Sequence, residues 1–345
     1  MTPTRIALAT RLLLAALPAL LACATPGLSL DELPERPIAV LYWEHDDARR
    51  RAELLQEQVE PEETHEGVAS VESLRSLLGG RRDPLMRQLA QWPGRLSLIQ
   101  PRTGEVSRVD AAPPGARPLS FSRDGRRLMF VHAGRGQRPQ LFEVDLQTGD
   151  LHTLTRGGDS HPRGDYGPDR RLVFSGVRTS GREWVATLYV SGPGGADPQK
   201  VTQGGVYDGV RFAPNGESIL YVQPGGAPRG RPASPKLLSR ALPFGEERVL
   251  TRGKDPVFSP DGSRIVYSAA VGDGWRLRRM RPDGSGRTAL GQGLRDELSP
   301  AVSPDGRFVA YVGQEAHMGR LFVRRMDGTG DRLLLGSGAV AWPVW

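Results

Sequence analysis

The chain alternates short apolar runs with turn residues in a pattern that repeats at an almost constant interval. Each copy begins with an apolar or aromatic anchor, passes through a turn of the Ser-Pro-Asp-Gly kind, and leads into a second apolar run. The five anchors are Phe121, Tyr166, Phe212, Phe258 and Val302, spaced 45, 46, 46 and 44 residues apart. A repeat of this length predicts a ring or stack of similar supersecondary units.

The copy at residues 255–290 predicts four strands. Residues 256–259 and 264–267 are apolar runs on either side of Pro260-Asp261-Gly262, whose residue types suit a tight turn. Residues 275–280 alternate apolar and basic side chains, and a second Asp-Gly turn leads to residues 287–290. Four hairpin-connected strands in about 40 residues are typical of one blade of a β-propeller.

The two ends of the sequence carry the pieces of one further blade. Residues 343–345 match the innermost strand of the other copies, and Trp345 follows Val302 by 43 residues. Strands predicted at residues 38–43, 95–99 and 105–109 supply the rest. We therefore expect an all-β fold, a six-bladed β-propeller with strand closure. Five blades are whole, and the sixth is a composite that removes the unpaired edges at the seam of the ring.

Residues 44–93 interrupt the composite blade with a helical pattern. Apolar side chains recur at helical spacing within residues 46–58 and 68–78, and again after Asp83-Pro84, a sequence that favours a helix start. This predicts a helical insertion within a propeller domain of residues 37–345. Two interpretations stay open: a recognition element for a partner, or a cover that only packs on the ring.

The N-terminus predicts a lipoprotein signal peptide over residues 1–22, followed by a linker over residues 23–36. Two arginines precede an apolar stretch of 11 residues, which is too short to span a bilayer. The stretch ends in Leu-Leu-Ala-Cys, which resembles the bacterial lipobox and implies lipidation of Cys23, the one cysteine of the chain. By the same resemblance, Ala24 implies sorting to the outer membrane. Ordinary signal cleavage after Ala24 is the alternative.

The formal net charge is +7, and only three of the 46 basic residues are lysines. The arginines are distributed over all the repeats without a basic tail or an aromatic-basic platform, so the composition does not favour nucleic-acid binding. The sequence also lacks a phosphate-binding glycine loop, metal-ligand spacing and a nucleophile motif. We therefore expect no cofactor, no metal and no enzymatic activity.

Two sets of carboxylates invite a functional interpretation. The turn residues Asp124, Asp169, Asp261 and Asp305 belong to different blades, and we expect them to bond their own backbone. The second set precedes the inner strands, where loops converge on the mouth of the central channel. Its members are Asp159, Asp208, Asp255, Asp296 and Glu297. A ring of these carboxylates predicts binding of a cation or a basic peptide segment, whereas the alternative is a solvated polar rim.

The repeats resemble the propeller blades of the TolB family, whose pattern is Pro-x-[Phe/Trp]-Ser-Pro-Asp-Gly-x-x-Ile-x-[Phe/Tyr]. Residues 256–267 and 302–311 carry this pattern most fully, and the resemblance covers about residues 95–345 plus residues 38–43. The second copy departs from it, because Arg170 stands where the turn glycine is expected. The resemblance implies a periplasmic propeller that binds envelope proteins, among them a peptidoglycan-associated lipoprotein.

Together these features predict a non-catalytic lipoprotein at the periplasmic face of the outer membrane, acting as a scaffold for protein–protein interaction. A periplasmic propeller that binds glycan or peptide ligands is the alternative. A propeller enzyme with its site in the loops is a third interpretation, because function is grafted onto a fold and not fixed by it.

Overall fold

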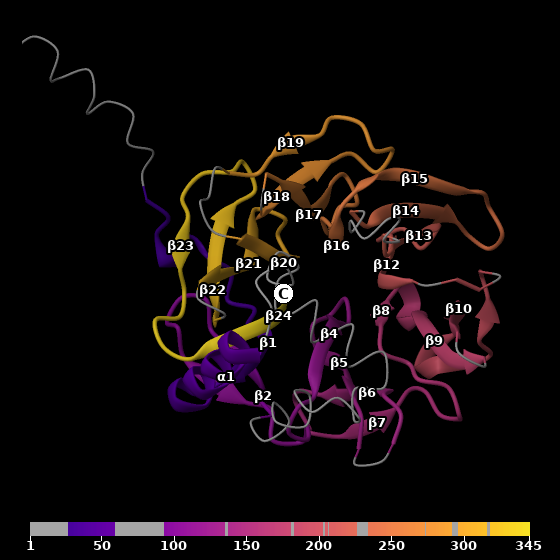
Figure 1. Cartoon of the computed structure of the whole chain (residues 1–345), viewed down its shortest axis with the longest axis horizontal. Coiled ribbons are helices and arrows are strands. Elements are labelled where there is room, and N and C mark those ends of the chain that lie inside the picture. The colour runs from indigo at the N-terminus through magenta and orange to yellow at the C-terminus, as the bar shows by residue number, and fades with distance from the viewer. Residues whose placement is uncertain are drawn as a thin grey trace, which may run out of the picture.

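The inner strands of six sheets surround a central axis (Figure 1). The computed structural model describes residues 27–345 apart from 59–92, 135–136, 181–182, 203, 206, 226–233, 273, 292–295 and 316–317. Within the described residues, the strands form six sheets of four strands each. The predicted six-bladed, all-β ring is therefore confirmed.

Five blades are continuous in the sequence, and in each of them the first strand is innermost and the following strands lie progressively further out. Blade 1 contains β4 (Arg117–Phe121), β5 (Arg127–His132), β6 (Gln140–Asp145) and β7 (Leu151–Thr153). Blade 2 contains β8 (Gly164–Tyr166), β9 (Leu172–Ser180), β10 (Glu183–Ser191) and β11 (Gln199–Lys200), with the short 3-10 helices η3 (Pro168–Arg170) and η4 (Pro193–Gly195) in its turns. Blade 3 contains β12 (Asp208–Phe212), β13 (Ser218–Gln223), β14 (Lys236–Ala241) and β15 (Glu247–Arg252).

The remaining whole blades complete most of the circle. Blade 4 contains β16 (Lys254–Phe258), β17 (Ile265–Val271), β18 (Gly274–Met280) and β19 (Thr288–Ala289). Blade 5 contains β20 (Asp296–Val302), β21 (Phe308–Glu315), β22 (Met318–Arg325) and β23 (Arg332–Leu333). In every whole blade the strands follow one another as antiparallel neighbours, as hairpin connections require.

The composite blade joins the two ends of the chain in the order β24-β1-β2-β3. Its strands are β24 (Ala339–Val344), β1 (Ile38–Trp43), β2 (Arg95–Ile99) and β3 (Val106–Arg108). The C-terminal strand is antiparallel to β1 and innermost, which places the chain end near the centre of the ring (Figure 1). Trp345 is 8% exposed, and its indole N–H donates to the Arg36 carbonyl at 2.8 Å. The predicted strand closure is confirmed.

The turn between the first and second strands repeats its hydrogen bonds from blade to blade. In blade 1 the Ser122 hydroxyl donates to Asp124 at 2.6 Å, and the same carboxylate accepts the Arg126 N–H at 3.0 Å. Asp261 and Asp305 bond the equivalent groups in blades 4 and 5. The carboxylates in these three turns therefore have the structural role predicted for them.

A left-handed backbone position closes each of these turns. Gly306 has φ of 72°, and the turn glycines of blades 1, 3 and 4 lie within a degree of it at 72° or 73°. Blade 2 lacks the glycine, and there Asp169 and Arg170 take φ of 56° and 59° instead. A positive φ strains a residue with a side chain, which is why glycine occupies this position in the other blades.

The space between neighbouring blades is filled by large side chains from the second strands. Tyr221, Tyr267 and Tyr311 occupy equivalent positions and are almost fully buried. The Tyr221 hydroxyl donates to Glu247 and the Tyr311 hydroxyl donates to Asp331, both at 2.5 Å. Tyr221 and Tyr311 therefore bury the apolar body of the ring while the hydroxyl keeps a partner, as a buried phenol requires.

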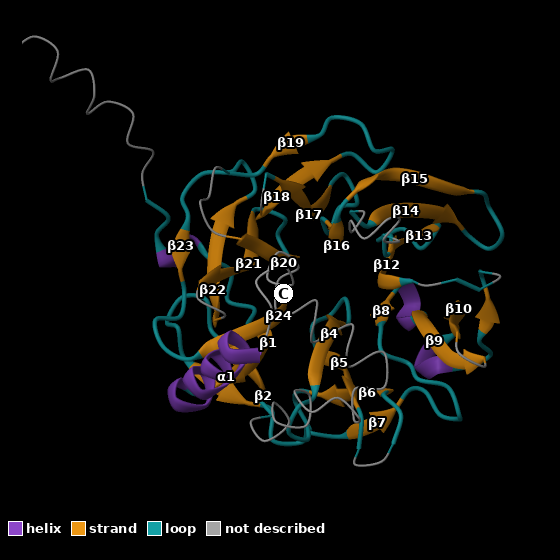
Figure 2. Cartoon of the chain, in the orientation of Figure 1, coloured by secondary structure: helices purple, strands orange, loops and turns teal. Residues whose placement is uncertain are grey.

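The first helix of the predicted insertion packs on the composite blade. Helix α1 (His45–Gln58) follows β1 and lies beside this blade (Figure 2). Ala48 is buried with Leu41 and Ala339, and the Arg51 guanidinium lies 4.7 Å from the centre of the Trp43 ring. The helices predicted at 68–78 and after Asp83-Pro84 lie outside the described residues.

Part of the predicted linker also packs on the ring. Leu28 and Leu33 are buried in the cluster between blade 5 and the composite blade. Between them is the 3-10 helix η1 (Leu30–Glu32), where Glu32 forms an ion pair with Arg325 at 2.8 Å. Residues 1–22 and Cys23, on which the signal and lipidation predictions rest, lie outside the described residues. Across the described part of the chain, no helix has the length and apolar character that crossing a membrane would need.

Candidate functional site

The inner strands bend where they begin, at the end of the channel opposite the repeated turns. Pairing with the second strand shifts register between Asp208 and Arg211, and blades 4, 5 and the composite blade show the same shift. The third residue before the anchor takes a left-handed backbone there: φ is 52° at Asp255, 50° at Ser299 and 51° at Trp342. A bulge of this kind redirects side chains, and proteins use bulges to shape sites.

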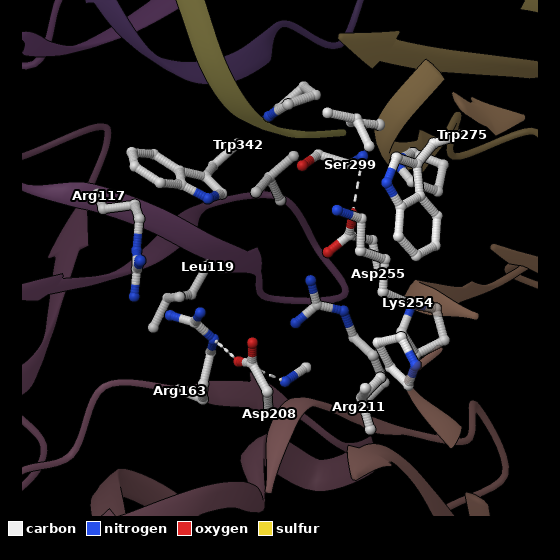
Figure 3. A pocket seen from close by; sticks show the side chains of 18 of the residues that line it. Arg117, Leu119, Arg163, Asp208, Arg211, Lys254, Asp255, Trp275, Ser299 and Trp342 are labelled. Carbon is white, nitrogen blue, oxygen red and sulfur yellow. Dashed lines mark hydrogen bonds and ion pairs between the residues drawn. The ribbon is translucent and has the colours of Figure 1, made fainter. Parts of the chain in front are cut away.

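This bulge position lines one cavity in all six blades. We call this cavity the mouth cavity, and its volume is ≈ 180 Å³. The six residues at the third position before the anchor are Pro118, Arg163, Gly209, Asp255, Ser299 and Trp342. No two of them are the same type, whereas the turn at the other end of the strand is nearly constant in blades 1, 3, 4 and 5. Labelled side chains from several blades converge on the cavity in Figure 3.

Cations outnumber carboxylates in the lining of the mouth cavity. The cationic lining residues are Arg117, Arg163, Arg211 and Lys254, and the carboxylates are Asp208 and Asp255. Asp208 forms an ion pair with Arg163 and accepts the Gly209 N–H at 2.8 Å. Burial favours a higher pKa for Asp208, but the charge and hydrogen bond of Arg163 outweigh it and leave the pKa below its usual value. This carboxylate is therefore a counter-ion that the site already holds.

Two tryptophans of the mouth cavity carry cations on their rings. The Lys254 ammonium lies 4.1 Å from the centre of the Trp275 ring, and Lys254 is itself only 9% exposed. The Arg117 guanidinium lies 4.9 Å from the centre of the Trp342 ring, and it donates to the Pro162 carbonyl at 2.9 Å. Attraction between a cation and an aromatic face fixes these long side chains at the edge of the cavity.

A second cavity of ≈ 450 Å³ lies at the other end of the channel, among the repeated turns. We call it the turn cavity. Asp165 lines it, is 9% exposed, and accepts the Phe212 N–H at 2.8 Å. Burial raises the pKa of Asp165 above its usual value, although the Arg211 charge opposes this shift.

The structure does not assemble the five predicted carboxylates into one ring. Asp208 and Asp255 line the mouth cavity, and Asp255 accepts the Ser299 N–H at 3.3 Å. Asp159 instead forms an ion pair with Arg178 at 2.9 Å and does not line the mouth. With two carboxylates against four cations, the described mouth does not have the acidic character that the sequence predicted.

The other two predicted residues hold blades 4 and 5 together. Asp296 accepts the Trp275 N–H at 2.7 Å. Glu297 is 0% exposed, accepts the Leu277 N–H at 2.9 Å, and forms an ion pair with Arg324 at 2.6 Å. Successive residues of a strand point to opposite faces of the sheet. A residue next to a channel-lining residue in the sequence can therefore have its side chain outside the channel.

Sequence reasoning missed Arg211, Lys254, Trp275 and Trp342. A usable signal was present for Arg211, Lys254 and Trp342, because the four residues before each anchor vary while the anchor and its turn recur. The basic residues were instead attributed to composition. What identifies them as a group is that they line one cavity from three different blades, which a linear sequence does not show.

The described residues contain no group of three or more His, Cys, Asp or Glu side chains that could hold a metal ion. His161, the histidine nearest to the predicted acidic set in sequence, is buried against Phe174 and shares a hydrogen bond with the Ser175 carbonyl at 3.1 Å. Burial lowers the pKa of His161, which favours its neutral form.

Comparison with known proteins supports the propeller and its type. No protein-family model matches the chain. The Tol-Pal system protein TolB of Anaeromyxobacter sp. (strain K) is 31% identical over 195 residues, which are 53% of this chain and 42% of that protein. The chain thus spans less than half the length of this relative. An uncharacterized peptidase, YuxL of Bacillus subtilis (strain 168), is 30% identical over 156 residues, 43% of this chain and 21% of that protein.

A solved structure extends the likeness to the fold. The crystal structure of TolB from Acinetobacter baumannii matches with a TM-score of 0.60 and 20% sequence identity, over 73% of this chain and 62% of that one. At this identity the match concerns the fold alone. Together with the sequence likeness and the ring of six four-stranded blades, it identifies a six-bladed β-propeller of the TolB type in this chain.

Proposed function

We propose that this protein is a non-catalytic binding propeller of the bacterial cell envelope, which holds a segment of another envelope protein at the mouth cavity. The observation that carries the proposal is the contrast within one repeat. The turn is kept from blade to blade, whereas the bulge position differs in all six blades and lines one cavity. Variation confined to a concave surface of a regular scaffold is the usual arrangement of a binding site.

The Tol-Pal system name of the sequence relative suggests where to look for the partner. Proteins of that system, including a peptidoglycan-associated lipoprotein, are the first candidates. The proposed location is the periplasmic face of the outer membrane, with the chain anchored by a lipid on Cys23. Its support is the lipobox-like Leu-Leu-Ala-Cys sequence, followed by Ala24.

Site-specific photocrosslinking tests the binding proposal. Trp342 lines the mouth and would be replaced by p-benzoylphenylalanine in cells. The matched control places the same residue at Phe244, which is 74% exposed in the turn between β14 and β15. We expect a crosslink from position 342 to one exported envelope protein, identified by mass spectrometry, and none from position 244. Equal crosslinking at both positions, or none at 342, would contradict the proposal.

Fatty-acid labelling tests the anchor separately. Cells grown with a labelled fatty acid should label the wild-type protein and leave Cys23→Ser unlabelled. Unlabelled wild type with a mature N-terminus at Thr25 would instead establish ordinary signal cleavage after Ala24.

A glycan or peptide ligand of the periplasm is a second candidate for the same cavity. The observation in its favour is the pair of tryptophans, Trp275 and Trp342, in the lining. Both rings already carry a cation, so a sugar ring would have to displace Lys254 or Arg117 before stacking. Binding of purified protein on a glycan array, without a crosslinked protein partner, would favour this candidate.

A further inference from the structure

The mouth cavity and the turn cavity share five lining residues, which therefore lie between them. The residues that line both cavities are Leu119, Arg211, Pro300, Pro343 and Val344. We call this set the waist, and Arg211 is its one charged member among the described residues. The Arg211 guanidinium also donates to the carbonyl of Val210 on its own strand at 3.2 Å. Any segment that enters from the mouth and reaches the waist therefore meets a single cation.

The charges around the waist lie on one side of the channel. Blades 1 to 4 supply every charged residue of the mouth lining, among them Arg117 and Lys254. The inner strands of blade 5 and the composite blade line the other side without a charge. Their lining residues are Leu298, Ser299, Pro300, Trp342, Pro343 and Val344. The channel is thus cationic along one arc and largely apolar along the opposite arc.

The acids of the mouth offset only part of the cationic arc, because two carboxylates face four cations. Asp208 is engaged by Arg163 and by the Gly209 N–H, and Asp255 accepts the Ser299 N–H. Behind the waist, burial raises the pKa of the Asp165 carboxyl while the Arg211 charge opposes this shift, so Asp165 is a further acid within reach of the Arg211 field. In a concave site of low dielectric, the resulting positive potential is stronger than the same charges would produce in water.

The volume of the mouth cavity limits what can enter it. Its ≈ 180 Å³ corresponds to roughly a dozen water molecules at about 15 Å³ of cavity volume each. A helix about 10–12 Å in diameter would not fit such a space, whereas one or two side chains of an extended segment would. An extended segment also presents alternate side chains to opposite sides, which matches a channel with two unlike arcs.

We propose that the mouth cavity selects an extended segment bearing a carboxylate on one face and apolar side chains on the other, and that Arg211 at the waist binds the carboxylate. This inference rests on the proposed binding function and specifies the chemistry of the partner. Lys254 and Arg117 supply the surrounding positive field, and the guanidinium of Arg211 provides paired N–H donors that match a carboxylate. The apolar arc packs against the remaining side chains.

Three synthetic octapeptides test the proposal with the full chain. The first alternates Glu and Leu with both ends blocked. The second replaces Glu by Gln, and the third is the Gln peptide with a free C-terminal carboxylate. Titration calorimetry measures binding, and the tryptophan fluorescence of the full chain supplies a second signal. We expect the blocked Glu peptide to bind at least about tenfold more tightly than the blocked Gln peptide. If only the third peptide bound tightly, the site would recognise a C-terminal carboxylate and not a Glu side chain, which would overturn the proposal.

Variants identify the cation responsible. Arg211→Gln should weaken binding of the Glu peptide at least about tenfold, whereas Arg211→Lys should retain part of it. Arg248→Gln is the matched control, because it removes the same charge from the exposed outer strand β15. Circular dichroism and thermal melting confirm that each variant is folded. Equal losses in Arg211→Gln and Arg248→Gln would show a general charge effect and overturn the proposal.

The outcomes separate this inference from the proposed function. A protein crosslink at position 342, combined with equal binding of the blocked Glu and Gln peptides, would keep the binding function and overturn acid selection. Absence of both the crosslink and peptide binding up to millimolar concentration would overturn both. Loss of Glu-peptide binding at high salt would agree with the inference, because screening weakens charge recognition.

Discussion

The two ends of the channel are built from the same six strands, yet they follow opposite rules. At the turn end, a serine and an aspartate repeat the same hydrogen bonds in three blades, and four glycines share φ of 72° to 73°. At the mouth end, the bulge position carries six different residues, three of them strained non-glycine residues with φ near 50°. The comparison separates a surface maintained for stability from one that stability alone does not explain.

The difference has a physical cause. Each turn must reverse the chain in a small space, so its geometry admits few residue types. A bulge at the start of an inner strand faces an open cavity, and many side chains fit there. A strained backbone conformation costs stability and persists only where the surrounding structure enforces it. Such conformations are concentrated at functional positions.

Removing residues 339–345 should produce the largest effect, because it removes the innermost strand of the composite blade and with it the closure of the ring. The deletion exposes the edge of β1, whose side chains are buried in the ring. We expect an unfolded or aggregated protein, measured by circular dichroism and light scattering. Trp345→Phe is the graded control. It keeps the ring contact and loses the 2.8 Å bond to the Arg36 carbonyl, at a cost of about 1 kcal/mol. A truncated chain that melts like the wild type would refute strand closure.

Glu297→Ala should be the next most damaging change, although sequence reasoning placed this residue at the binding mouth. The substitution leaves the 2% exposed Arg324 side chain without its main counter-ion. Breaking a buried pair costs roughly 3–5 kcal/mol, and we expect the lower end because Asp331 remains 3.3 Å from Arg324. Chemical denaturation measures the loss. We also expect the folded fraction to bind the Glu peptide as the wild type does. Reduced binding would show that Glu297 takes part in the mouth site.

Gly306→Ala isolates the backbone requirement of the turn end. The added Cβ would meet only the Pro260 side chain at 3.8 Å, so the φ of 72° is the main obstacle. We expect a loss of about 1–2 kcal/mol in unfolding free energy, with peptide binding unchanged. Gly336→Ala is the control, since it has open space and no left-handed backbone. Similar stability losses in both variants would show that φ is not the cause.

Ser299→Gly should stabilise the protein, because it relieves a left-handed backbone at the mouth. The strain of about 1–2 kcal/mol exceeds the extra chain entropy of glycine, so we expect a net gain of about 0.5 kcal/mol. The Ser299 N–H keeps its bond to Asp255. Ser303→Gly, at the turn end of the same strand, should instead cost about 1 kcal/mol, because it removes the hydroxyl that bonds Asp305 and the Phe308 N–H. If both substitutions raised, or both lowered, the free energy of unfolding, the proposed difference between the two ends of the channel would be wrong.

Asp208→Asn should have a small effect that depends on pH. Its ion pair with Arg163 gives Asp208 a lower pKa in the folded than in the unfolded chain, and the side chain is 30% exposed. The resulting stabilisation, up to about 1 kcal/mol, is present above the ordinary pKa of 3.8 and disappears as the pH falls through the folded-state pKa. Melting temperatures should therefore differ at pH 7 and converge in acid. Asp110→Asn, on an exposed loop, is the control, and a difference that persists in acid would refute the linkage.

Much of the ring could be predicted from particular residues. The spaced anchors gave the number of blades, and residues 343–345 gave the closing strand, since both depend on local patterns that any repeat must keep. Asp124, Asp261 and Asp305 were correctly placed in turns for the same reason. Packing of Leu28 and Leu33 on the seam was not predicted, because two leucines in a short segment have no periodicity to interpret.

The sequence by itself determined the blades and their turns, because these follow from hydrogen bonds and side-chain alternation within some forty residues. It also indicated the closure, because residues 343–345 repeat the pattern of an inner strand. Only the tertiary structure decided the character of the mouth. A bulge turns Asp255 toward the axis while strand alternation buries Glu297 between blades, and Arg211 meets Lys254 and Trp342 there from different blades. Charge in a channel is the sum over residues far apart in the chain, so only their arrangement in space makes this mouth cationic.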